Sequence, residues 1–272
     1  MKTKKEKVVK KSRGISAGVV ILFCLIIAFL FFTFVCGRPE NFVDNNPKGH
    51  PLDGNIFGTL YKGGYVIPLV MTLLFTVITL SVERFFALKK ARGKKDLVKF
   101  VTGVKAKLDV NDMDGARTLC DAQQGAVANI LRAGLLRYED VEKIEGMNND
   151  EKAAIIQKEL EEATALELPS MEQNLPIIAT ISTLGTLFGL LGTVLGMIRS
   201  FAALANEGAP DSMALSTGIS EALMNTAMGI GTGALAIIFY NVFSQQVQNI
   251  TNAVDEIGFA VGQTYTKKHL GK

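Results

Sequence analysis

The stretch TISTLGTLFGLLGTVLGMIRSF, residues 180–201, decides how this chain folds. It has the length and apolarity of a helix that crosses the ~30 Å hydrocarbon core of a bilayer, which takes about 20 residues. Four glycines recur in it at spacings of three and four residues: Gly185, Gly189, Gly192 and Gly196. Because glycines at this spacing let two helices approach closely, the stretch predicts a transmembrane helix with a tightly packed face.

A stripe of small and hydroxyl-bearing residues follows one face of the same predicted helix. Its members are spaced by three or four residues: Ser182, Thr186, Gly189, Thr193, Gly196 and Ser200. Tight packing accounts for the glycines, whereas a row of hydroxyls through a bilayer would suit a water-filled lumen. The stripe is therefore interpreted as pore-lining or packing, and Asn225 and Gly229, further along the chain, share this interpretation.

A second stretch, STGISEALMNTAMGIGTGALAIIFYNVF, residues 216–243, carries the one acid that lies away from the ends of every predicted span. An ionised acid near the centre of a spanning helix costs about 3 kcal/mol, so Glu221 should face protein or water and is a candidate functional residue. The alternative is that Glu221 lies near the outer surface of the membrane and only pairs with Arg199.

The two stretches are expected to form an antiparallel hairpin whose turn is centred on Gly208. Thr193 then lies opposite about residue 223, so it shares one level of the membrane with Glu221 and Thr226. Five residues separate Glu221 from Thr226, which puts about 140° between them around the helix. We expect Thr193 and Thr226 to face a lumen. Glu221 is expected in a groove between helices, with Asn225 one turn below it.

Nearly half of the 272 residues are hydrophobic, and four uncharged stretches have spanning length. The sequence therefore predicts an all-α, polytopic membrane protein with spans at residues 15–36, 65–83, 175–200 and 213–245. The first span follows a basic region, as in a signal peptide. It is longer than the usual apolar region of a signal peptide and no A-x-A-like site follows it, so we interpret it as an anchor.

Basic residues gather in the N-terminal residues 1–14, directly after the second span, and near the C-terminus. Lys and Arg mark the cytoplasmic side, so both termini are expected in the cytoplasm. This orientation makes 37–64 a periplasmic loop, 201–212 a periplasmic turn, 84–174 a cytoplasmic helical domain and 246–272 a cytoplasmic C-terminal helix and tail.

The cytoplasmic region has apolar residues at helical spacing and charged residues between them, which predicts helices near 112–123, 126–138 and 150–168. Asp150 can cap the last of these helices. That helix is expected to continue as a stalk into the third span.

Several segments resemble one known family: FGLLGTVLGMI (188–198), ISEALMNTAMGIGTGALAIIFYNVF (219–243), VERFFALKKA (82–91) and DMDGARTLC (112–120). The likeness covers about residues 60 to 250 and is to the MotA/TolQ/ExbB proton-channel family, nearest to ExbB and then TolQ. By this resemblance, Thr193, Glu221 and Thr226 match the polar intramembrane positions that the family uses around its ion path.

The resemblance implies a homo-oligomer, a pentamer of long helices around a central pore in the bacterial inner membrane. The pore would hold a single-span ExbD/TolR-like subunit, whose membrane Asp loads and releases the proton. The implied function is to use the proton motive force to energise outer-membrane transport through a TonB-like protein, with TolQ-like envelope maintenance as the alternative. Two departures stand out: Thr186 replaces a proline found in many relatives, and the first span is additional.

Other classes of function have less support. A passive membrane scaffold remains open, whereas a flagellar stator of the MotA type usually has a larger cytoplasmic domain. No nucleotide-binding, hydrolase or metal-ligand motif is recognisable, so we predict no enzyme, no cofactor and no metal site. The basic N-terminus is explained by membrane orientation, and no nucleic-acid partner is predicted. The three cysteines cannot form an intrachain disulfide framework.

Overall fold

The computed structural model describes residues 16–47, 49–205 and 212–269. Helices make up nearly all of this part of the chain, and within it no β-strand forms beyond an isolated bridge between Phe42 and Pro51. The all-α prediction is confirmed. The chain divides into two compact units, described separately below. We call residues 15–84 and 174–243 the membrane unit, and residues 85–173 and 244–272, with the N-terminal 1–14, the charged unit.

The candidate spanning helices are α1 (Ala17–Phe31, extended by the π-helical turn Phe32–Cys36), α3 (Val66–Arg92), α8 (Leu175–Leu204) and α9 (Ser212–His269). Four helices of the described chain are long and apolar enough to cross a membrane, in agreement with a multi-pass membrane protein. The bulky side chains of α1 are largely exposed, for example Val19, Leu22 and Phe23. Such a surface suits contact with lipid. The expected turn at Gly208 and the basic N-terminal residues lie outside the described residues.

The segment between α1 and α3 is folded. It contains two single 3₁₀ turns (Pro39–Asn41 and Val43–Asn45) and α2 (Ile56–Lys62). Asn55 caps α2 by accepting a hydrogen bond from the Gly58 amide at 3.0 Å, and Asn41 donates to the Val35 carbonyl at 2.8 Å. The Phe42 ring is buried against Tyr61, so aromatic packing and side-chain caps hold this segment on the end of α1.

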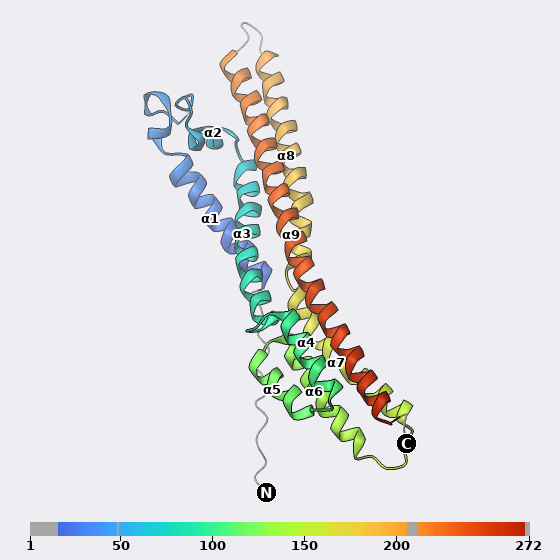
Figure 1. The fold of residues 1–272 in the computed structure, drawn as a ribbon. Helices are drawn as coiled ribbons and strands as arrows, with labels where there is room; N and C mark the ends of the chain where they lie inside the picture. Colours follow the sequence, from blue (N-terminus) through green and yellow to red (C-terminus); the bar gives the residue numbers. More distant parts are fainter. Residues whose placement is uncertain (1–15, 48, 206–211, 270–272) are drawn as a thin grey trace. The chain divides into compact units, whose positions relative to one another are not determined.

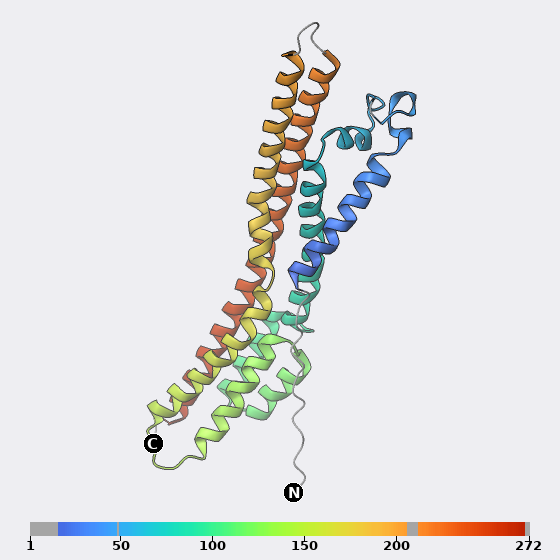
Figure 2. The ribbon, with the colours of Figure 1, turned by 180° about the vertical axis from the view of Figure 1, so that it is seen from behind.

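Helices α8 and α9 pack backbone to backbone along the membrane unit, and lie side by side in both ribbon views (Figures 1 and 2). A methyl group added at Gly229 would lie 2.6 Å from the Gly185 carbonyl oxygen and from the Gly189 Cα. One added at Gly196 would lie 2.8 Å from the Gly218 carbonyl oxygen. Only glycine leaves room for this approach, so the predicted packed face of α8 is the face that α9 covers.

The charged unit contains α4 (Leu97–Asp109), α5 (Met113–Gln123), α6 (Ala126–Glu142), α7 (Asn149–Glu172), and residues 244–269 of α9. A buried stripe at spacings of three and four residues runs along this part of α9: Ile250, Val254, Ile257, Val261 and Tyr265. Its last ring meets the Tyr138 ring of α6 edge to face, with 5.0 Å between centroids. The C-terminal part of α9 is thus a component of this core.

Two details of the helical prediction were wrong. Helix α7 does not run on into α8 as one stalk, because Asn174 adopts a left-handed backbone conformation with φ 67° between them. Its side chain donates to the Glu83 carboxylate at 3.3 Å, which links this break to α3. Asp150 lies inside the first turn of α7, whose N-cap is Asn148, so it favours the helix through its charge and does not cap it.

The close packing of α8 on α9 predicts an asymmetry between two neighbouring glycines. Gly229→Ala forces a methyl group against the backbone of α8, whereas a methyl group at Gly231 meets nothing within 4 Å. We expect Gly229→Ala to destabilise the protein by about 1–3 kcal/mol, as overpacking does. Thermal unfolding in detergent measures this. Gly231→Ala is the matched control, and equal losses in the two variants would contradict the packing.

Burial raises the pKa of the Cys120 thiol to about 12. The thiolate is the nucleophile, so the thiol stays protonated and unreactive near neutral pH. We expect a maleimide at pH 8 to label Cys120 much more slowly in the folded protein than after unfolding in SDS, as followed by peptide mass spectrometry. Labelling of the folded protein at the rate of a free peptide thiol would contradict this.

Candidate functional site

The Thr193 and Thr226 hydroxyls meet across the α8–α9 hairpin. Each threonine is half-buried, and each hydroxyl also lies 3.2 Å from a carbonyl oxygen of its own helix, Thr193 from Gly189 and Thr226 from Ala222. The Thr193 hydroxyl lies 3.4 Å from the Ala222 carbonyl oxygen as well. The two helices thus bring a pair of hydroxyls together in an otherwise apolar hairpin, close to the register expected from the sequence.

The rest of the polar stripe on α8 is largely taken up by packing. Ser200 is buried and donates to the Gly196 and Leu215 carbonyls, at 3.1 and 3.3 Å. Ser182 donates to the Ala179 carbonyl of its own helix at 2.7 Å, and the exposed Thr186 lies beside Gly233 of α9. Within one chain, most of the stripe therefore packs against α9.

Glu221 is buried in the membrane unit and forms an ion pair with Arg199. The distance from Arg199 Nη1 to Glu221 Oε1 is 2.5 Å. The glutamate side chain is only 7% exposed, whereas the arginine side chain is 50% exposed. A buried carboxylate needs a partner of opposite charge. The pairing considered as an alternative is therefore present, but the carboxylate lies within protein.

Besides α8 and α9, a third segment packs around Glu221. It is the corner between α2 and α3, residues 63–65. Gly64 has φ +70°, and a methyl group there would lie 2.2 Å from Glu221 Oε1. One turn further along α9, the buried Asn225 donates to the Gly63 carbonyl at 2.9 Å. Asn225 Oδ1 has no hydrogen-bond donor among the described residues. Glu221 and Asn225 thus face the α2–α3 corner, while Thr226 faces α8.

Reasoning from the sequence missed the part played by this corner. The signal that could have revealed it is the Gly63-Gly64 pair immediately before the second span, because adjacent glycines there permit close approach of another group. Gly192 of α8 belongs to the same cluster, since a methyl group on it would lie 2.4 Å from Asn225 Cβ. Three segments therefore enclose Glu221 and Asn225: α8, α9 and the α2–α3 corner.

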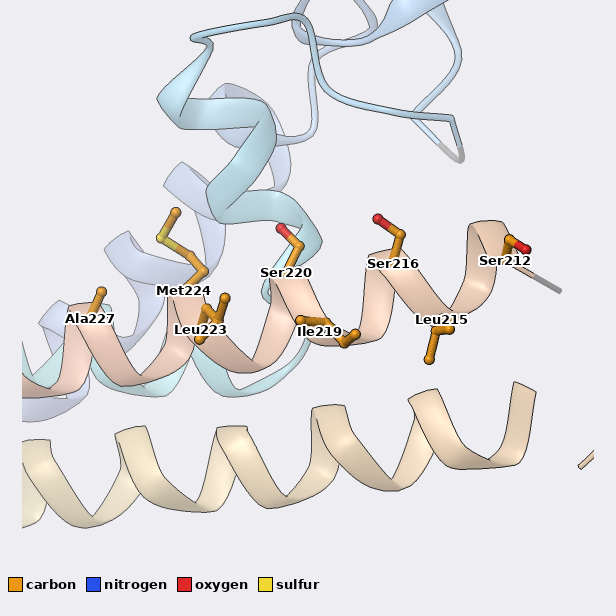
Figure 3. A pocket seen from close by; sticks show the side chains of 8 residues that line it. All are labelled: Ser212, Leu215, Ser216, Ile219, Ser220, Leu223, Met224 and Ala227. Carbon is orange, nitrogen blue, oxygen red and sulfur yellow. The ribbon is translucent and has the colours of Figure 1, made fainter. Parts of the chain in front are cut away.

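A hollow of about 600 Å³ runs along the first turns of α9 (Figure 3). Serine and aliphatic side chains line it: Ser212, Leu215, Ser216, Ile219, Ser220, Leu223, Met224 and Ala227. Figure 3 shows Ser216, Ser220 and Met224 directed to the side of α9 on which α2 and the start of α3 lie. The small serines leave this part of α9 thinly covered, immediately beside Glu221.

The described residues contain no cluster of three or more His, Cys, Asp or Glu side chains that could hold a metal ion. What they offer is a multi-pass helical membrane protein whose polar groups are gathered in one hairpin. That combination agrees with the comparison of residues 122–256, which match the MotA/TolQ/ExbB proton channel family. The chain belongs to this family.

Individual relatives carry two of the family's three names, ExbB and TolQ. The chain is 30% identical over 221 residues to the biopolymer transport protein ExbB-like 1 of Synechocystis sp., covering 76% of this chain and 80% of the relative. It is 28% identical over 218 residues to the Tol-Pal system protein TolQ of Haemophilus influenzae, covering 74% and 91%. A third match, ExbB-like 3 of Synechocystis sp., is 42% identical over 86 residues, only 31% of this chain and 41% of that relative.

The ion pair predicts energetic coupling between Arg199 and Glu221. We expect a double-mutant cycle of Arg199→Met and Glu221→Gln to give a coupling energy of about 1 kcal/mol, small because the arginine is half-exposed. Unfolding in mixed SDS micelles measures it. The control cycle combines Glu221→Gln with Arg92→Met, whose guanidinium pairs with Asp96, and should be additive. Additivity in both cycles would contradict the pair.

Proposed function

We propose that this chain is the proton-channel subunit of an ion-driven motor complex in the bacterial inner membrane. In this proposal both termini and the charged unit lie in the cytoplasm, and the segments 37–64 and 201–212 lie in the periplasm. The motor uses the proton motive force to energise outer-membrane transport through a TonB-like partner. The observation that carries the proposal is the contact of the Thr193 and Thr226 hydroxyls inside an apolar hairpin.

The threonine pair suits contact with a proton carrier. A hydroxyl can donate one hydrogen bond and accept others, so it can stabilise a carboxyl group in either protonation state. Each hydroxyl has one proton, so in this contact one threonine donates to the other and only the second can donate to its own helix; the oxygens keep lone pairs that can accept. We infer that this pair faces the proton-loading carboxylate of an ExbD/TolR-like single-span subunit, held in a pore between five copies of this chain, the number that the family resemblance implies.

Glu221 has a different role in this proposal. Its carboxylate is balanced by Arg199 and enclosed by the Gly64 corner, so it supplies a fixed charge beside the path. The buried acceptor Asn225 Oδ1, next to it, suits a bound water or a donor from another chain. The serines in the hollow along α9 would let a neighbouring helix approach this cluster, and its aliphatic side chains would pack against that helix.

The energy available per step supports a motor that repeats its cycle. One proton crossing the membrane potential yields about 2.3 kcal/mol per 100 mV, which is little mechanical work for a single transit. Repeated protonation and deprotonation of the partner carboxylate at the threonine pair would add up the energy of many such transits. Helix α9 continues from the threonine pair to residue 269, so it could connect the pair to the cytoplasmic side.

The proposal predicts that both hydroxyls are needed. Thr193→Val and Thr226→Val keep the side-chain shape but remove the oxygen, and each should lower partner-dependent proton flux by about tenfold or more. The measurement is dye-detected proton uptake into liposomes holding the chain with a co-purified single-span partner. Thr217→Val is the matched control, because among the described residues the Thr217 hydroxyl hydrogen-bonds only to the Met213 carbonyl of its own helix.

The outcome also tests the passive-scaffold alternative. Full flux in both valine variants would reject the ion path through the threonine pair. A scaffold further predicts that Glu221→Gln weakens assembly, seen as loss of the oligomer in gel filtration, without changing flux per assembled complex. TolQ-like envelope maintenance remains the alternative output, because relatives of both names match; co-purification of a TolA-like and not a TonB-like protein would favour it.

A further inference from the structure

A groove of about 580 Å³ opens in the charged unit, between the last turns of α3, the start of α4 and residues 246–256 of α9. Its floor is apolar and fully buried, formed by Leu88, Val101 and Ile250. At its mouth, Phe85 and Val98 are 51% and 71% exposed. The groove therefore has an apolar floor and two hydrophobic side chains at its entrance, while Gln246, Asn249 and Asn252 make its α9 wall polar.

The rim of this groove is basic. Lys89 and Arg92 line it, and Lys89 makes no ion pair within the described ranges. Arg92 lies 3.4 Å from Asp96, with both side chains about half exposed, so that pair is weak. The acid of the lining, Glu256, is already paired with Lys105 at 2.5 Å. The groove therefore favours a ligand with one negative group and an apolar body.

The position of the rim along α3 indicates where such a ligand would come from. The same helix contains the predicted span that ends at residue 83, and Lys89 follows six residues later. At 1.5 Å per residue this is about 9 Å beyond the hydrocarbon core. The headgroup layer extends about 5–8 Å beyond the core on each side, and a lysine side chain is long enough to reach it.

We propose that this groove binds one anionic phospholipid of the leaflet on the Phe85 side of the membrane. The headgroup phosphate lies between Lys89 and Arg92, and part of an acyl chain passes Phe85 and Val98 onto the apolar floor. Basic pockets beside transmembrane helices recognise lipid headgroups through this combination of charge and apolar contact. The inference rests on the proposed placement of α3 in the membrane, and is independent of the proton path.

Native mass spectrometry of the delipidated full-length protein tests the proposal. Phosphatidylglycerol and phosphatidylcholine with the same acyl chains are titrated separately, and lipid adducts are counted per chain. We expect preferential retention of phosphatidylglycerol. Lys89→Gln with Arg92→Gln should weaken that retention by about tenfold or more, because each surface charge contributes substantially to anionic lipid binding. Val98→Trp should weaken it without any change of charge, by filling the mouth of the groove.

The matched control is Lys90→Gln with Lys94→Gln, which removes the same charge from neighbouring exposed positions outside the lining. It should retain phosphatidylglycerol as the wild type does. Equal loss in the control, or equal retention of both lipids, would overturn the proposal. Displacement of the lipid by millimolar inorganic phosphate would also overturn it. A disulfide between two copies of the Val98→Cys variant would do the same, because it would identify a second chain as the occupant. A failed proton assay leaves these results unaffected.

Discussion

The approach of α8 to α9 is the constraint on which the rest of the membrane unit depends. Glycines on both helices, such as Gly185 and Gly229, leave no side chain between the two backbones. In a bilayer, where lipid tails are as apolar as leucine, this close van der Waals contact is what holds helices together. The same closeness brings the Thr193 and Thr226 hydroxyls into contact, so the packing that builds the hairpin also builds its polar pair.

Polar groups in this unit are satisfied in two different ways. Hydroxyls such as those of Thr72, Thr76 and Thr232 donate to the carbonyl four residues earlier, which removes their need for another partner. The Glu221 carboxylate cannot do this, because an ionised carboxylate has no proton to donate to a backbone carbonyl. When buried, it needs a partner of opposite charge. Arg199 supplies it, and the glycine corner before α3 leaves room for the carboxylate. A charge inside the unit therefore ties three segments together.

The periodicity of the sequence was enough to predict much of this protein. Four helices of spanning length, the packing of α8 on α9 and the helical character of the charged region follow from apolar runs and from three- and four-residue spacings, and the structure has them. The register of the hairpin was also close, since Thr193 meets Thr226 and the Ala222 carbonyl. These features are local or involve two neighbouring helices, so spacing along the chain is sufficient to reveal them.

The tertiary structure alone decided the features that join distant segments. The contact of Gly64 with Glu221 spans most of the chain, and no periodicity reports which loop will lie beside which helix. The break at Asn174 was missed for another reason: asparagine adopts the left-handed conformation more readily than most residues and Pro176 follows it, so the signal was local and was overlooked. The sequence by itself determined which residues lie on which helical faces; the tertiary structure decided which faces meet, since that depends on contacts between residues far apart in the chain.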